Sequence, residues 1–331
     1  KNHAVMMAAS KDIFGPYEEN QRNPVLTTRH VTNDYFVNSI GHADMIQLPD
    51  SRWYMVSLGK RNDLDGDANM GRETYLIPMK WEPTIVKWQQ VSETKWEPVR
   101  YLFPVAAPLS GKVERFFPLP FAEKPQYISN SYVDDFSSKN LNLKWTFIRV
   151  PQNKTYSLNV NPGYLRLYPK PNTIENRKNF SLIGFRQKES DFDYEVKMNY
   201  KPSDEGVESG IIHYQKERNF LTSTIYKAGK KIFLEQRLKE KDKKLVSLKK
   251  VSLKKYNGSI IFKTISRKDE YTFYYSLDDG ENFTYLSSLD ALKLLDRNYT
   301  GALLGMFATS NGKKTKDYAD FDWVRYKDYI R

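Results

Sequence analysis

Apolar and polar residues alternate with a period of two along most of this chain, which is the pattern of β-strands with one buried and one solvated face. The clearest case is the segment 193–200, where aromatic, valine and methionine side chains alternate with charged and amide side chains. Helical periodicity is scarce. The one segment that favours a helix, 290–295, is short, with Ser288 available as its N-cap. The pattern therefore predicts an all-β protein.

Turn residues between strand-like runs predict two hairpins. The runs 43–48 and 53–60 flank a Pro-Asp-Ser-Arg turn, and the runs 271–277 and 283–286 flank an Asp-Asp-Gly turn. Short strands with turn signals recur evenly over the second half of the chain. Such spacing is typical of a sandwich of two sheets.

A proline-rich stretch separates the two halves of the chain. Prolines at positions 104, 108, 118, 120 and 125 fall where neither a central strand nor a helix can form. We interpret 102–126 as the connection between two domains, 1–128 and 129–331. With 331 residues, of which 40% are hydrophobic, the chain is long enough for two folded cores.

The composition excludes several classes of protein. The apolar runs are all shorter than the roughly eighteen residues that a membrane-spanning helix needs, so we expect no membrane partner. There are no cysteines, which excludes disulfides, a thiolate nucleophile and a cysteine-built zinc site. The lack of cysteine does not indicate a compartment, and the localisation stays open.

The net charge of +12 comes from the second half of the chain. Residues 1–128 contain 15 basic and 15 acidic residues, whereas residues 129–331 contain 37 and 25. Lysine pairs interleaved with apolar residues are concentrated between 227 and 255, as in hairpin strands with a charged outer face. A basic patch can bind phosphates, but no nucleic-acid-binding motif accompanies this one. We expect a solvated face and no nucleic-acid partner.

Two segments contain the candidate binding residues, namely Gly-His-Ala-Asp at 41–44 and Gly-Arg-Glu-Thr at 71–74. Each places one polar side chain, His42 or Arg72, beside a strand rich in aromatic and apolar residues. An imidazole offers one donor and one acceptor, and a guanidinium offers a rigid fork of donors. Together they suit a ligand with several hydroxyls. The alternative is a buried structural histidine and a surface arginine.

The two segments belong to an ordered series of motifs. Earlier motifs are His-Ala-Val-Met (3–6), Gly-Pro-Tyr-Glu (15–18) and Asn-Pro-Val (23–25), and later ones are Asp-Asp-Phe (134–136), Gly-Tyr-Leu-Arg-Leu (163–167), Thr-Gly-Ala (300–302) and Ala-Asp-Phe-Asp-Trp (319–323). The series resembles glycoside hydrolase family 43, in its β-xylosidase and α-L-arabinofuranosidase branch. The resemblance implies the last blades of a five-bladed β-propeller, followed by a concanavalin-like β-sandwich.

The resemblance also implies a mechanism. Members of the family are inverting glycosidases that use a general-base Asp, a second Asp and a general-acid Glu, with room for a water molecule between acid and base. In the family these carboxylates lie on earlier blades. No segment here matches them, so we assign no catalytic residue to this chain and expect all three upstream of Lys1. The fragment alone is expected to be inactive.

Two site residues follow from the resemblance by position. Arg72 matches the arginine that hydrogen-bonds the sugar in the innermost subsite. His42 matches the histidine near the propeller axis, and we expect the two on neighbouring blades. In parts of the family that histidine borders a water cluster or a calcium ion. We therefore expect a structural calcium ion held by His42 through waters, with no cofactor required, and Asp44 on the same strand face as His42.

Three further segments give weaker signals. The acidic run 63–67 resembles the start of an EF-hand loop but lacks the glycine and glutamate that the loop requires, so we expect a solvated loop. Six tryptophans are candidates for stacking on a sugar ring, of which Trp53 and Trp323 are expected in the core. In related enzymes a sandwich loop closes the mouth of the active site, and the segment 309–317 is our candidate for it.

The leading hypothesis is therefore part of an inverting β-xylosidase or α-L-arabinofuranosidase that acts on xylo-oligosaccharides or arabinosyl side chains. The alternative is a non-catalytic carbohydrate-binding or scaffold protein built from the sandwich. The sequence does not separate xylosidase from arabinofuranosidase, because the residues that gate the pocket lie mostly upstream. It leaves the oligomeric state open.

Overall fold

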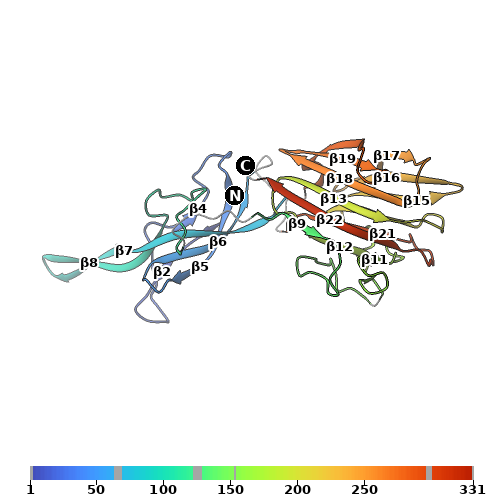
Figure 1. Cartoon of the computed structure of the whole chain (residues 1–331). Helices are drawn as coiled ribbons and strands as arrows, with labels where there is room; N and C mark the ends of the chain where they lie inside the picture. Colours follow the sequence, from blue (N-terminus) through green and yellow to red (C-terminus); the bar gives the residue numbers. More distant parts are fainter. Residues whose placement is uncertain (1–2, 63–68, 122–128, 153, 296–299, 330–331) are drawn as a thin grey trace. The chain divides into compact units, whose positions relative to one another are not determined.

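The computed structural model describes residues 3–62, 69–121, 129–152, 154–295 and 300–329. The chain folds into two compact units, 1–127 and 128–331. Each is built from antiparallel strands, so the chain is all-β, as predicted (Figure 1). In the part that the structure describes, no helix is long and apolar enough to span a membrane.

The centre of the first unit is a four-stranded antiparallel sheet with its strands in chain order (Figure 1). Its strands are β5 (Val37–Gln47), β6 (Trp53–Arg61), β7 (Arg72–Ser92) and β8 (Lys95–Ala106). Four two-residue strands pair beside it, β1 (Ala4–Val5) with β4 (Leu26–Thr27) and β2 (Ala8–Ala9) with β3 (Glu18–Glu19). Four antiparallel strands in sequence are the blade of a β-propeller. The predicted hairpin between 43 and 60 is the β5–β6 pair.

One face of this sheet forms the core of the first unit. Met55, Ile77 and Met79 are buried there against Leu26 and Val37. The ring of Trp53 packs edge-on against that of Trp81, with centroids 5.5 Å apart, and both rings lie against the same cluster. Both rings are only partly buried, but they pack against the core cluster, as predicted for Trp53.

The predicted connection at 102–126 begins too early. Strand β8 continues to Ala106, and it contains Pro98 and Pro104. Both prolines are tolerated because β8 is the last strand of the sheet and pairs on one side only, with β7. Prolines are compatible with an edge strand such as β8, which the prediction did not take into account.

The second unit is a sandwich of an eight-stranded and a six-stranded antiparallel sheet. The first sheet has the order β10-β11-β22-β13-β18-β19-β20, with β9 also paired to β22, and the second has the order β12-β21-β14-β15-β16-β17. The eight-stranded sheet comprises β9 (Tyr132–Asp134), β10 (Tyr156–Ser157), β11 (Leu165–Leu167), β13 (Asp191–Asn199), β18 (Ser259–Arg267), β19 (Glu270–Ser276), β20 (Thr284–Asp290) and β22 (Ala319–Tyr329). The six-stranded sheet comprises β12 (Ser181–Arg186), β14 (Glu208–Lys216), β15 (Asn219–Ala228), β16 (Lys231–Lys239), β17 (Val246–Ser252) and β21 (Leu303–Thr309).

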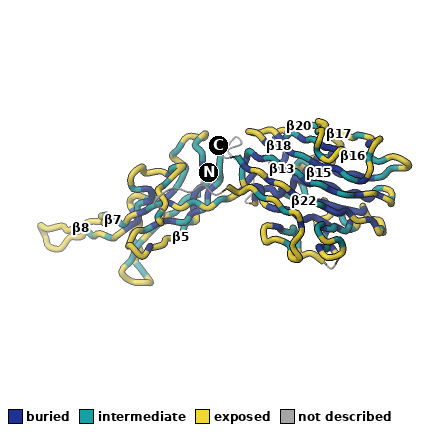
Figure 2. Tube along the Cα trace, viewed as in Figure 1, coloured by how far each residue is buried: buried dark blue, intermediate teal, exposed yellow. Residues whose placement is uncertain are grey.

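Strand β13 has the alternation that the sequence predicts. Phe192, Tyr194, Val196 and Met198 are buried, and the residues between them are partly exposed. Figure 2 shows buried residues along the strands of both sheets, and exposed residues mainly at turns and edges. The predicted hairpin at 271–286 is the β19–β20 pair.

The lysine-rich segment forms the hairpin of β16 and β17, as predicted. Strand β17 is the last strand of its sheet, and all of its residues except Val251 are exposed. The excess positive charge therefore lies largely in solvent.

The predicted helix at 290–295 is a single 3₁₀ turn, Ala291–Leu294. Its cap is Asp290, whose side chain accepts a hydrogen bond of 2.8 Å from the backbone N–H of Leu292. The predicted cap, Ser288, lies inside β20. A segment of six residues with one cap is too short for a stable α-helix, because the first turn of a helix is costly to form and few further residues follow it.

His213 on β14 is the one histidine of the second unit and is buried between the two sheets. The rings of Tyr194, Tyr271 and Phe273 surround it, with centroids 5.2–6.1 Å from that of the imidazole. Neither ring nitrogen has a hydrogen-bond partner among the described residues. Burial lowers the pKa of His213 from 6.5 to about 3, so the imidazole is neutral in the folded protein.

This buried imidazole predicts a pH dependence of stability. Between pH 6.5 and about 3 the unfolded chain binds a proton at His213 and the folded chain does not. The free energy of unfolding should therefore fall as the pH drops through this window, by about 1.4 kcal/mol per pH unit from this residue, and should not change from this cause above it. Urea unfolding of the wild type and of His213→Phe from pH 7 downwards measures the difference. The exposed His30→Phe is the control, and parallel curves for wild type and His213→Phe would refute the assignment.

Candidate functional site

The segment that carries His42 contains two consecutive β-bulges. Gly41 pairs with Leu58 and Asp44 with Val56, so His42 and Ala43 both lie opposite the single residue Ser57. Another register shift lies directly upstream, between Asn38 and Gly41. Bulges redirect side chains and are frequent next to functional sites. The backbone accommodates them with positive φ angles of 55° at Ser39 and 53° at His42.

Gly41 allows the start of the chain to pack against these bulges. A Cβ atom at this position would lie 2.9 Å from Nδ1 of His3 and 3.1 Å from the backbone nitrogen of Ala4. The His3 ring is held by a contact of 3.0 Å between Nδ1 and the carbonyl oxygen of Ser39. The hydroxyl of Ser57 donates a hydrogen bond of 2.7 Å to the carbonyl oxygen of Gly41. These contacts hold the bulged backbone beside His42.

His42 itself is exposed, so the alternative of a buried structural histidine is wrong. Ala43, the next residue, packs against the core cluster of the first unit. Asp44 is exposed and pairs with Val56. The extra residue in the bulge interrupts the alternation of faces between His42 and Asp44. The rule that would place them on one face therefore does not apply here.

Arg72 is the first residue of β7 and follows Gly71, whose φ angle is 71°. It is exposed and lies directly opposite Lys60 on β6. The next residue, Glu73, accepts two hydrogen bonds from Arg61, of 3.1 Å from Nε and 2.6 Å from Nη2. Such a bidentate pair has a defined geometry, so it fixes the start of β7 next to Arg72.

The two predicted site residues come from one sheet and not from neighbouring blades, so that prediction is wrong. His42 is on β5 and lies opposite Ser57 of β6. Arg72 is on β7 and lies opposite Lys60 of β6, so β6 separates the two strands. Two strand spacings across the sheet and three residues along β6 separate their backbones by roughly 14 Å. Asp44 pairs with Val56, and Arg72 pairs with Lys60, four residues further along β6. The side chains of Asp44 and Arg72 therefore lie on the same face of the sheet, opposite to the face of the core residue Met55.

Several carboxyl groups of the first unit form ion pairs, among them those of Asp50 and Glu82. Within its described residues, every shift in a carboxyl pKa is downward. A hydrogen bond from the Thr32 side chain lowers the pKa of Asp34, one from Arg52 lowers that of Asp50, and one from Lys80 lowers that of Glu82. A general acid requires a raised pKa instead. The described residues thus offer hydrogen-bonding groups for a ligand, and none of these three carboxyls has the character of an acid catalyst.

Among the residues that the structure describes, no group of three His, Asp or Glu side chains is placed to hold a metal ion. A calcium ion near His42 would therefore need most of its oxygen ligands from waters or from carbonyl groups. The predicted acidic loop at 63–67 lies outside the described residues.

The remaining tryptophans differ in exposure. Trp145 is buried against Phe136 and Phe185, whereas Trp88 and Trp96 on the β7–β8 hairpin are 58% and 56% exposed. Trp88 pairs with Pro98 and Trp96 with Gln90, which places both indoles on one face of that hairpin. Trp323 on β22 is only partly buried and lies under the guanidinium of Arg325, 4.1 Å from its ring centroid. It pairs with Lys197 and lies on the face opposite to that of the buried Val324, so its expected place in the core is wrong.

The predicted lid segment, 309–317, is tied to other loops of the second unit. The hydroxyl of Thr309 donates hydrogen bonds of 3.1 Å to the carbonyl oxygens of Lys170 and Asn172. At the other end, the Asp317 carboxylate accepts hydrogen bonds from the backbone N–H groups of Ser203 and Asp204. Its role as a lid stays a prediction.

Comparison with known proteins places these motifs in a family. The family described as "Beta xylosidase C-terminal Concanavalin A-like domain" matches residues 133–327, and "Glycosyl hydrolases family 43" matches residues 1–84. The chain therefore belongs to glycosyl hydrolase family 43, in the group with this C-terminal domain. The expected propeller portion and concanavalin-like sandwich are confirmed.

Individual relatives match nearly the whole of this chain, but only part of their own length. A non-reducing end alpha-L-arabinofuranosidase of Bacteroides ovatus is 29% identical over 98% of this chain and 58% of its own length. A xylosidase/arabinosidase of Butyrivibrio fibrisolvens is 28% identical over 97% of this chain and 59% of its own length. The crystal structure of the family 43 protein BlXynB from Bacillus licheniformis superposes with a TM-score of 0.80 at 25% identity, over 98% of this chain and 60% of that one. The chain thus spans about 60% of the length of these proteins.

The packing of Gly41 against His3 predicts the effect of adding one methyl group. Gly41→Ala should destabilise the first unit by about 1–3 kcal/mol, because the new Cβ meets the His3 ring and the Ala4 backbone. In a His3→Ala background the same substitution should cost less, since one of the two neighbours is removed. Denaturant unfolding of the four proteins in this cycle measures the coupling. Additive effects would show that His3 does not constrain Gly41.

Proposed function

We propose that this chain is part of an inverting glycoside hydrolase that releases xylose or arabinofuranose units from xylo-oligosaccharides or arabinosyl side chains. The observation that supports it most is the placement of His42 and Arg72 on one sheet of a family 43 propeller portion. In this proposal the two side chains form part of the wall of the sugar-binding pocket. The printed names of the relatives, which include xylosidases and arabinofuranosidases, support the substrate class.

The geometry supports a binding role in two ways. Arg72 stands directly opposite Lys60, so two cationic side chains start from neighbouring positions at one end of β6 and β7. A guanidinium in such a position donates several hydrogen bonds to sugar hydroxyls without needing an ionised ligand. The bulge at His42 presents an exposed imidazole that both donates and accepts. Asp44, on the same sheet face as Arg72, adds an acceptor to the proposed pocket wall.

Catalysis in this proposal needs carboxylates that we do not assign to the chain. Inversion requires an acid and a base about 6.5–9.5 Å apart. The relatives are longer than the match, and the activity is therefore proposed for a protein with a complete propeller. No cofactor takes part in the proposed hydrolysis, and a calcium ion near His42, held through waters, stays a prediction.

Replacement of Arg72 tests the proposal. In the full-length protein, Arg72→Ala should lower kcat/KM on aryl xylosides or arabinofuranosides by about 100-fold, because a hydrogen bond from a charged donor to a buried ligand contributes about 1.5–3 kcal/mol. Arg100→Ala, an exposed arginine on β8, is the matched control and should have little effect.

Assays on both p-nitrophenyl glycosides also separate the two substrate classes. Unchanged kcat/KM in a folded Arg72→Ala protein would refute the placement of Arg72 in the pocket. A full-length protein that hydrolyses neither glycoside would contradict the proposed activity and favour the scaffold alternative.

A further inference from the structure

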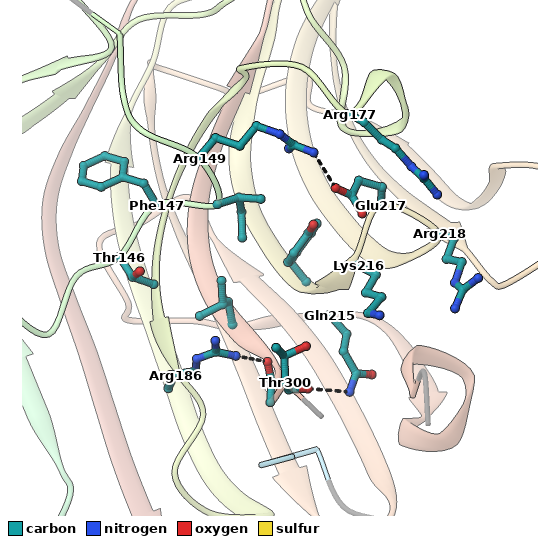
Figure 3. Close-up of a pocket in the computed structure, with 14 residues that line it drawn as sticks. Thr146, Phe147, Arg149, Arg177, Arg186, Gln215, Lys216, Glu217, Arg218 and Thr300 are labelled. Atoms are coloured by element: carbon teal, nitrogen blue, oxygen red, sulfur yellow. Dashed lines mark hydrogen bonds and ion pairs between the residues drawn. The ribbon is translucent and has the colours of Figure 1, made fainter. Parts of the chain in front are cut away.

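The second unit contains an open pocket of about 570 Å³ whose described lining residues all belong to that unit (Figure 3). It lies at one end of the six-stranded sheet, where β12 ends, β14 turns into β15 and β21 begins. Arg186 and Tyr214 both pair with Leu303, which places these three residues in one row on one face of the sheet. The segment 146–149 also lines the pocket, and Thr146 in it pairs with Gly184 on β12. The size is within the range of small-molecule sites.

Cationic side chains dominate the lining of this pocket. They are Arg149, Arg177, Arg186, Lys216 and Arg218. The single carboxylate in the lining is Glu217, which accepts a hydrogen bond of 2.8 Å from Nη2 of Arg149. Burial acts to raise the pKa of Glu217, but its own backbone N–H and the ion pair with Arg149 outweigh burial and lower it. Glu217 is therefore ionised at neutral pH, and its charge offsets only one of the five cations.

Several of these cations are available for a ligand. Within the described residues, no carboxylate forms an ion pair with Lys216 or Arg177, although the charge of Arg177 also helps to lower the pKa of Glu217. Arg186 is half-buried, and burial lowers its pKa. Among the described residues, its side chain donates one hydrogen bond, from Nη1 to the carbonyl oxygen of Gly301. Arg149 keeps a second nitrogen, Nη1, that is buried without a partner among the described residues. Like charges gathered in a concave site attract an anion more strongly than the same charges spread over a surface.

Neutral hydrogen-bonding groups stand among the cations. Gln215 and Thr300 meet at the lower wall in Figure 3, where the Gln215 amide donates a hydrogen bond of 3.4 Å to the Thr300 carbonyl oxygen. Thr146 contributes a hydroxyl. A bare inorganic anion would use only the cations, whereas a saccharide would also engage the amide and the hydroxyls.

We infer that this pocket binds an anionic saccharide, with a sugar carboxylate held by Lys216 and Arg177, and with neighbouring hydroxyls held by Arg186, Gln215 and the two threonines. A uronic acid unit within a short oligosaccharide has this combination of groups. Guanidinium groups suit it because they bind a carboxylate through two parallel hydrogen bonds. The inference is independent of the proposed hydrolysis, because it concerns binding in the second unit and no catalytic step.

Isothermal titration calorimetry of the whole 331-residue chain tests the inference. The probes are a xylotetraose that carries one glucuronic acid, the unsubstituted xylotetraose, and inorganic phosphate. We expect the acidic oligosaccharide to bind at least about tenfold more tightly than either of the others, and its affinity to fall with added salt.

A double substitution links the binding to the pocket. Lys216→Ala with Arg177→Ala removes two cations that make no ion pair, so the fold should persist, and the affinity for the acidic oligosaccharide should drop by about tenfold or more. Lys249→Ala with Lys254→Ala removes the same charge from exposed positions on and after β17, and it should leave the affinity unchanged.

Each other outcome would overturn the inference. Equal binding of the neutral oligosaccharide would mean that the charge is not recognised. Equal binding of phosphate would mean a general anion site. An equal loss in the two double variants would mean that overall charge, and not this pocket, attracts the ligand. No binding of the acidic oligosaccharide would leave the pocket without the proposed ligand.

Discussion

The pairing of β5 with β6 is the constraint on which the candidate sugar site depends. Two extra residues in β5, one in each bulge, change which side chains reach the open face of the sheet. The glycine at 41 makes this possible, because it leaves room for the ring of His3 and the first described strand. The bidentate pair of Arg61 and Glu73 fixes the start of β7 on the other side of β6. Backbone geometry, and not a network between His42 and Arg72, therefore determines where these groups stand.

Much of the fold was predictable because its causes are local. Alternating side chains define β13, and turn residues define the hairpins of β5–β6 and β19–β20. The bulge at His42 was not predictable, since it depends on which residues of β6 lie opposite, and that register is a property of two strands. The partly buried position of Trp323 was missed for a similar reason. A strand-like pattern gives the alternation of faces but does not say which face is covered.

The cationic pocket was missed because its lining comes from distant segments. Arg149, Arg186 and Lys216 lie on a loop, at the end of β12 and at the end of β14, and only the sheet order β12-β21-β14 brings them together. In the sequence, the highest density of positive charge is in the lysine pairs around β16 and β17, and these lysines are largely exposed to solvent. A few cations around a concave site thus favour the binding of an anion more than a larger number of cations on an exposed edge strand.

The prolines of β8 have a consequence beyond the position of the domain boundary. An outer strand normally offers a complete row of amide N–H groups to which another polypeptide can add itself. Pro98 and Pro104 interrupt this row, and the exposed lysines of β17 repel a like-charged neighbour at the margin of the other unit. These two edges are in this way poor templates for the addition of a strand from another chain.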